Sequence, residues 1–153
     1  MSIEIERKYL LKALPDDLCC GELINQGYVS VGDPEVRVRK KGKEYFITKK
    51  SGKGFIRTEE EVLINEAFFK DLWSLTAGKR IEKTRYTMVG SDGLVWEIDE
   101  YHGVLAGLFI AELELKNKDD EFKIPQAIQA VMTVDVTEDE RYKNKNLAVD
   151  GLP

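Results

Sequence analysis

The stretch Glu4-Ile5-Glu6-Arg7-Lys8 opens the chain with a charged residue at every second position. Residues two apart on a β-strand point to the same face. Glu4, Glu6 and Lys8 are therefore expected to share one face of a strand over residues 3–11, whereas Ile5 and the apolar residues after it share the other. The strand would present two carboxylates and one ammonium group together.

Later segments repeat this spacing and keep charges of one sign together. The pairs are Arg37 with Arg39, Glu59 with Glu61, Lys83 with Arg85, Glu97 with Asp99, and Glu112 with Glu114. A solvated sheet face accounts for any one such strand, but a solvated face more often mixes signs because like charges on one face repel. Segregated charges indicate ligands. Carboxylates bind hard cations such as Mg2+ or Mn2+, and Arg and Lys bind phosphate oxygens.

The alternation predicts an α+β, mainly β fold within one domain over residues 1–153. Strands are expected over residues 3–11, 28–31, 35–40, 44–49, 55–64, 81–89, 94–101 and 110–115, with glycine turns at 41–43, 51–54 and 91–93. Four helices are expected: one capped by Asn65, one over residues 16–26 after Pro15, a short one from Pro125 through Met132, and a C-terminal one with Thr137 and Glu140 as a capping box. Charged faces turned into a closed barrel would leave the apolar faces for helices outside.

Composition excludes several classes of protein. A hydrophobic content of 42% and a charged content of 33% fit neither a disordered tail nor a membrane protein, and the N-terminus lacks the pattern of a secretory signal, so a soluble, cytoplasmic protein is expected. The net charge of −5 argues against general nucleic-acid binding. Cys19 and Cys20 are adjacent, and neighbouring cysteines rarely reach disulfide geometry, so we interpret them as reduced structural thiols. Symmetric dimers are the commonest oligomers of soluble proteins, so the sequence is compatible with a homodimer.

The charged motifs together resemble a known family. Glu4-x-Glu6-x-Lys8 resembles the ExExK signature of the CYTH superfamily, the triphosphate tunnel metalloenzymes, and further matches follow in order across nearly the whole chain. They include Glu35-Val-Arg37-Val-Arg39, Arg57-Thr-Glu59-Glu-Glu61, Glu82-Lys83-Thr-Arg85, Trp96-Glu97-Ile-Asp99 and Glu112-Leu-Glu114. The chain is most similar to the short bacterial members that act on inorganic tripolyphosphate. The resemblance implies a tunnel-like barrel of eight antiparallel strands with helices packed outside, and divalent-metal hydrolysis of a triphosphate.

The resemblance also implies roles for individual residues. The implied metal ligands, for Mg2+ or Mn2+, are Glu4, Glu6, Asp99, Glu112 and Glu114. The implied phosphate ligands are Lys8, Arg37, Arg39, Lys50, Lys83 and Arg85. Catalysis would rest on Glu4, Glu6, Lys8, Lys83, Arg85 and Glu114, and Glu59, Glu61 and Glu97 match acidic tunnel positions of open role.

Several assignments keep an alternative. Lys50 rather than Lys49 is expected to face the tunnel because it shares a face with Thr48, and a register slip of one residue would exchange them. Arg141 and Lys143, expected on the C-terminal helix, either contact phosphate or complement nearby surface acids. Tyr28 either lines the tunnel or packs in the core.

The leading functional hypothesis is hydrolysis of inorganic tripolyphosphate to diphosphate and phosphate. A small bacterial-type adenylate cyclase and a thiamine or nucleoside triphosphatase use a similar charged interior, so they remain alternatives. The short chain leaves little room for a purine or thiamine pocket, which favours the inorganic substrate. From other classes, a noncatalytic polyphosphate-binding module or a structural domain with a solvated charged sheet would carry the same alternation.

Overall fold

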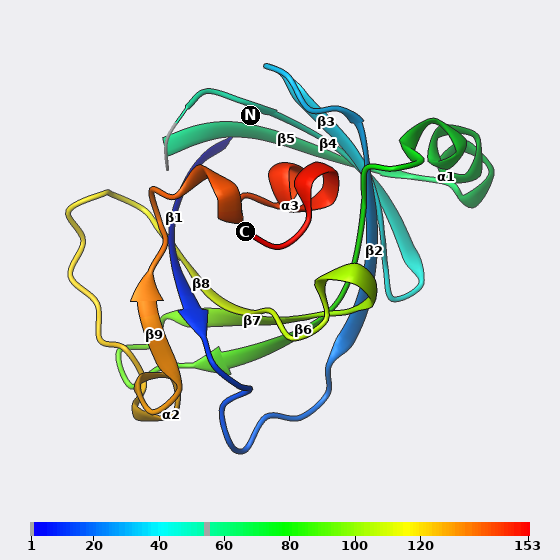
Figure 1. Cartoon of the computed structure of the whole chain (residues 1–153). Helices are drawn as coiled ribbons and strands as arrows, with labels where there is room; N and C mark the ends of the chain where they lie inside the picture. The colour runs from blue at the N-terminus through cyan, green and yellow to red at the C-terminus, as the bar shows by residue number, and fades with distance from the viewer. Residues whose placement is uncertain (1, 54–55) are drawn as a thin grey trace.

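The computed structural model describes residues 2–53 and 56–153. Over these residues, antiparallel strands follow one another around a sheet in the order β5-β4-β3-β2-β6-β7-β8-β1-β9, and β1 also pairs with β5. Eight strands therefore close into a barrel, as expected, and β9 continues beside β1 (Figure 1). The strands are β1 (Ser2–Leu11), β2 (Glu22–Ser30), β3 (Glu35–Lys41), β4 (Glu44–Ser51), β5 (Ile56–Ile64), β6 (Arg80–Val89), β7 (Val95–Tyr101), β8 (Phe109–Leu115) and β9 (Met132–Asp135).

Short helices lie between and after the strands. They are α1 (Glu66–Trp73), α2 (Gln126–Gln129) and α3 (Asn144–Asp150), with 3-10 turns η1 (Ser74–Thr76), η2 (Gly103–Leu105) and η3 (Glu140–Tyr142). Asn65 caps α1 as expected, since its side chain accepts a hydrogen bond from the Phe68 N–H. Figure 1 shows α1 and α2 outside the ring of strands, whereas α3 is seen within it. None of the helices in the described ranges combines the length and apolar character needed to cross a bilayer.

Three helix predictions were wrong in type or extent. Residues 16–26 form no helix, because Ile24, Gln26 and Tyr28 alternate as fully buried residues on β2, and this period of two outweighs the helix-start signal of Pro15. Thr137 caps no helix. Its hydroxyl accepts from the Lys8 N–H instead, and Asp139 caps η3. The helix after Pro125 ends at Gln129, because the chain continues into β9 beside β1.

The outer face of β1, β7 and β8 carries one hydrophobic core. Its buried members are Ile5, Tyr9, Leu11, Trp96, Ile98, Ala111, Leu113 and Leu115, together with Ile128 of α2. The members on the three strands lie at the positions that the alternation placed opposite the charges. Burying them against α2 and the neighbouring loops leaves the charged partners on the same strands directed into the barrel.

A second hydrophobic core lies inside the barrel, beyond the charged residues. It contains Ile81, Tyr101, Leu105, Leu108 and Ile110, and Leu147 of α3 packs into it. Ile81 and Ile110 each lie two residues from a buried charge on the same strand, Lys83 and Glu112, so they share its face. Along the barrel axis the interior thus changes from charged to apolar, and α3 packs at the apolar part.

Candidate functional site

Charged residues of seven strands line one cavity inside the barrel. The cavity holds about 180 Å³ and is bounded by Glu4, Glu6, Arg37, Arg39, Lys41, Lys50, Glu59, Lys83, Arg85, Glu97, Glu112, Glu114 and Asn144. Glu4, Arg37, Arg39, Lys50, Lys83 and Glu112 are buried, although each carries a charged group. A buried charge needs a partner, so a cavity lined in this way is built for a charged occupant.

Strand register brings carboxylates of like charge face to face on β1, β7 and β8. Glu6 pairs directly opposite Glu114, and Glu97 opposite Glu112. Like charges at directly opposed positions destabilise a sheet. Burial raises the pKa of Glu114, and the charges of Glu4, Glu6 and Glu97 add to the effect. The carboxylates on this side of the cavity therefore repel one another, and the cations of the protein do not fully neutralise them.

Glu4 lies between a cation, Lys50, and another carboxyl group, Glu59. Its Oε1 accepts from the Lys50 Nζ at 3.0 Å. Burial raises the Glu4 pKa, and the close carboxyl of Glu59 raises it further, while Lys50 opposes both. The outcome is a carboxylate that is held by a cation on one side and repelled by a carboxylate on the other.

Cations line the cavity from β3, β4 and β6. Burial lowers the pKa of Arg39 to about 10, and the neighbouring Arg37 adds to the effect. Lys50 is 8% exposed and lines the cavity, whereas Lys49 is exposed, which is the orientation that we expected. The barrel interior thus concentrates positive charge in a protein whose net charge is −5.

Asp99 holds two of these cations. It is fully buried and pairs across β6 and β7 with Arg85, whose Nε and Nη2 donate to its two oxygens at 2.7 and 2.8 Å. The Lys83 Nζ lies 2.8 Å from Oδ2 of the same carboxylate. Both oxygens are therefore engaged by protein cations, an arrangement that the expected role of Asp99 as a metal ligand did not anticipate.

The described ranges contain no preformed metal cage. Over residues 2–53 and 56–153, no three His, Cys, Asp or Glu side chains are grouped so that they could hold an ion. The donor chemistry nevertheless fits a hard divalent cation, because Glu4, Glu6 and Glu114 present carboxylate oxygens to the cavity and repel one another. Glu112 is less free, since its oxygens lie 3.6 Å from Lys8 and 3.9 Å from Arg85.

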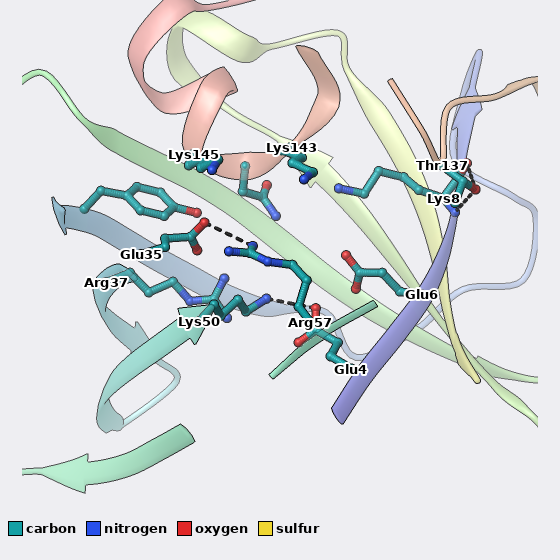
Figure 2. Close-up of a pocket in the computed structure, with 12 residues that line it drawn as sticks. Glu4, Glu6, Lys8, Glu35, Arg37, Lys50, Arg57, Thr137, Lys143 and Lys145 are labelled. Carbon is teal, nitrogen blue, oxygen red and sulfur yellow. Dashed lines mark hydrogen bonds and ion pairs between the residues drawn. The ribbon is translucent and has the colours of Figure 1, made fainter. Parts of the chain in front are cut away.

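A smaller cavity of about 40 Å³ adjoins the first and shares Glu4, Glu6, Arg37, Lys50 and Asn144 with it. Figure 2 shows Lys8, Lys143 and Lys145 directed into it from one side and Arg37, Lys50 and Arg57 from the other. The Lys8 Nζ donates to the Tyr142 carbonyl at 3.1 Å, so the C-terminal segment directly contacts the opening strand.

The smaller cavity contains residues that the sequence reasoning missed: Glu35, Arg57, Thr137, Asn144 and Lys145. The two-residue spacing could have found Arg57, which shares a face with Glu59, and Glu35, which shares one with Arg37. Their side chains form an ion pair at 3.2 Å. No local pattern indicates the other three, because they reach the cavity only through the docking of the C-terminal segment.

The remaining candidates lie in different environments. Tyr28 is fully buried and lines the smaller cavity, with its hydroxyl accepting from Gln26. Lys143 lines that cavity as well, but it precedes α3 rather than lying on it. Arg141 lies on η3 with its side chain 68% exposed and ion-paired to Asp139, so it is outside both cavities. Glu61 of β5 forms an ion pair with Arg39, with 3.1 Å between the Arg39 Nη2 and the Glu61 Oε2.

Comparison with known proteins gives full-length relatives. The chain is 40% identical over 153 residues to the inorganic triphosphatase of Nitrosomonas europaea, with 95% of this chain and 97% of that protein covered. It is 36% identical over 151 residues to the inorganic triphosphatase of Acetivibrio thermocellus, with 96% and 94% covered. No family model matches the sequence.

Solved structures similar to this chain include an inorganic triphosphatase as well. The crystal structure of the inorganic triphosphatase NE1496 superposes with a TM-score of 0.71 at 39% identity and covers 98% of this chain and 97% of that one. HpAC1 from Hippeastrum superposes with a TM-score of 0.56 at 14% identity, covering 74% and 80%. At that identity the likeness concerns the fold alone.

Proposed function

This chain belongs to the family of the inorganic triphosphatases, and from that premise we propose that it hydrolyses inorganic tripolyphosphate to diphosphate and phosphate. The observation that carries the proposal is the larger cavity, in which opposed carboxylates face a set of buried cations. A phosphate chain with a divalent cation complements both groups at once.

The lining of the cavities supports an inorganic substrate. Among the described residues that bound them, Tyr28 is the one aromatic side chain, and it is fully buried beside Gln26. A nucleobase or a thiazolium ring binds on exposed aromatic or apolar surface, whereas phosphate needs only cationic donors. The chemistry of the lining therefore favours tripolyphosphate over ATP or thiamine triphosphate.

The cations would bind and orient the phosphate chain. Arg37, Arg39 and Lys50 surround one side of the cavity, and Lys83 and Arg85 approach from β6. Because Asp99 fixes Arg85 through two hydrogen bonds, its guanidinium is oriented before substrate arrives. Positive charge arranged in advance stabilises negative charge that develops on the transferring phosphoryl group and on the leaving diphosphate.

The carboxylates would hold Mg2+ or Mn2+ and position the attacking water. Glu4, Glu6 and Glu114 are the residues that we assign to the metal, because they present oxygen donors to the cavity without two cationic partners of their own. A bound divalent cation supplies charge neutralisation on the phosphate chain and lowers the pKa of its water. Lys8, beside Glu112, would contact the phosphates from β1.

The proposal is tested by phosphate release from tripolyphosphate, ATP and thiamine triphosphate, each with Mg2+ or Mn2+. We expect tripolyphosphate to give the highest kcat/KM. Glu4→Gln and Glu6→Gln should each abolish most of the activity, and Glu60→Gln, on the exposed side of β5, is the matched control that should retain it. Cyclic AMP formation from ATP with tripolyphosphate left intact would overturn the proposal.

A second pair of variants separates an enzyme from a binding module. Lys50→Ala should raise the KM for tripolyphosphate, because Lys50 lines the cavity, whereas Lys49→Ala on the exposed face should not. If wild-type protein binds tripolyphosphate by calorimetry but releases no phosphate with either metal, the chain is a binding module.

A further inference from the structure

The two cysteines of the chain lie outside both cavities. Cys19 and Cys20 are in the connection between β1 and β2, their side chains are exposed, and no disulfide joins them. Figure 1 shows this connection running outside the ring of strands. The interpretation as structural thiols was therefore wrong, because neither side chain packs into a core.

The chain is anchored on both sides of the pair. Leu14 and Leu18 pack against the outer hydrophobic core before it. After it, Gly21 lies so close to β6 that an added Cβ would fall 2.5 Å from the Thr84 Cγ2. The two thiols are thus presented from a segment held at each end, which lowers the conformational entropy lost when a ligand joins them.

The two thiols lie on adjacent residues, so both sulfurs are carried by the same short stretch of chain. Hydrogen bonding with Cys20 raises the pKa of the Cys19 thiol, and repulsion between the two sulfur charges adds to the effect. A ligand that takes both sulfurs at once needs this proximity. The chain has no other cysteine to compete for such a ligand.

Backbone geometry disfavours a direct disulfide. The bond between the two cysteines is trans, because the cis peptide among the described residues is Asp33-Pro34. Adjacent Cα atoms across a trans peptide are about 3.8 Å apart, whereas disulfides usually need roughly 4.4–6.8 Å. One bridging atom between the sulfurs removes this constraint. Thiolate sulfur is a soft ligand and selects soft acceptors.

We propose that Cys19 and Cys20 form a chelating site for trivalent arsenicals, each sulfur supplying one bond to the same arsenic atom. The reaction with phenylarsine oxide illustrates the chemistry. Two thiols replace the oxygen of C6H5As=O to give C6H5As(S-Cys)2, and the oxygen leaves with the two thiol protons as water. Arsenic stays trivalent, so neither an oxidant nor a reductant takes part.

The experiment uses full-length protein and phenylarsine oxide, followed by mass spectrometry of the intact chain. We expect one C6H5As group per chain, with the loss of two hydrogens and of both free thiols. 2,3-Dimercaptopropanol should remove the group, whereas an equal thiol concentration of 2-mercaptoethanol should not.

Single variants supply the control. In Cys19→Ser and Cys20→Ser, affinity should fall at least about 100-fold, because only a second thiol on the same segment binds intramolecularly. Both side chains are exposed, so circular dichroism should show the wild-type fold in each variant. Retention of the arsenical by either variant to within about threefold of wild type, or an adduct that bridges two chains, would overturn the proposal.

Discussion

Asp99 shows how one buried carboxylate can organise a cationic wall. It is fully buried, and both of its oxygens bind Arg85 or Lys83. These contacts hold its pKa well below the ordinary value despite burial. Because both oxygens are occupied by these cations, we regard Asp99 as a positioning residue for the proposed reaction.

Removal of this carboxylate should be severe. In Asp99→Asn, two buried cations lose their shared counter-charge, and breaking a buried ion pair costs about 3 kcal/mol or more. Urea unfolding should show this loss. Asp139→Asn is the matched control, because Asp139 pairs with the exposed Arg141 and should change stability by less than about 1 kcal/mol. Equal effects of the two substitutions would contradict the claim that Asp99 stabilises the two buried cations.

Lys83 predicts the alkaline limit of activity. Burial lowers its pKa from 10.5 to about 8, with Asp99 opposing the shift. Since the lowered pKa means that the charged form is lost above pH 8, kcat/KM for tripolyphosphate should fall as pH rises through that value. Lys83→Arg should shift this limb upward, because arginine keeps its charge. An unchanged alkaline limb in that variant would assign the titration to another group.

The ionised Glu114 is expected to lower the stability of the metal-free protein and to be needed for activity. Its raised pKa means that the ionised carboxylate is less favourable in the folded chain, so stability is greatest below the ordinary pKa and is lost as pH rises through the raised one. At neutral pH, Glu114→Gln should raise the melting temperature in EDTA and lower triphosphatase activity with Mg2+ or Mn2+. A fall in melting temperature would show that the carboxylate stabilises the metal-free protein.

The sequence predicted the direction of most charged residues but not their partners. Period two is local, so it placed Arg85 and Asp99 on inward faces. Their pairing depends on the register between β6 and β7, which no local pattern specifies. For the same reason the opposition of Glu6 to Glu114 appears only in the folded barrel.

At the scale of elements, the strands were more predictable than the helices. The period-two alternation of a strand shows in the sequence which residues face inward and which face outward. The short helices depend on the residues that they pack against, which the sequence does not show. The position of α3 is an example. Its sequence gives no indication that Leu147 enters the apolar core inside the barrel.

Leu147 should therefore matter more than its place near the chain end suggests. It is 1% exposed, and Leu147→Ala leaves a cavity in the inner core that should cost about 3 kcal/mol. Val149→Ala, whose side chain lies on the exposed face of the same helix, is the control and should cost under about 1 kcal/mol. Thermal unfolding measures both. Similar losses would show that α3 does not depend on that core.

At the scale of the whole molecule, the two halves of the cavity predict coupled binding. Carboxylates and cations line the same cavity. A bound metal ion neutralises the carboxylates that repel triphosphate, and bound triphosphate neutralises the cations that repel the metal ion. Tripolyphosphate with Mg2+ should raise the melting temperature by more than the sum of the two added singly, because a ligand specific for the folded state stabilises it. Additive shifts in a four-way comparison with EDTA would indicate separate sites.

β1 carries a consequence for how the molecule is made. It pairs with β5, β8 and β9, so its partners extend from residue 56 to residue 135. During synthesis β1 leaves the ribosome before β5, β8 and β9, so it has no complete set of partners until β9 has followed. Contacts this distant in sequence slow folding, and an unpaired strand can associate with other chains meanwhile. The strand that brings Glu4, Glu6 and Lys8 to the cavity is thus made before all three of its partner strands, and its pairing is completed only after the last of them.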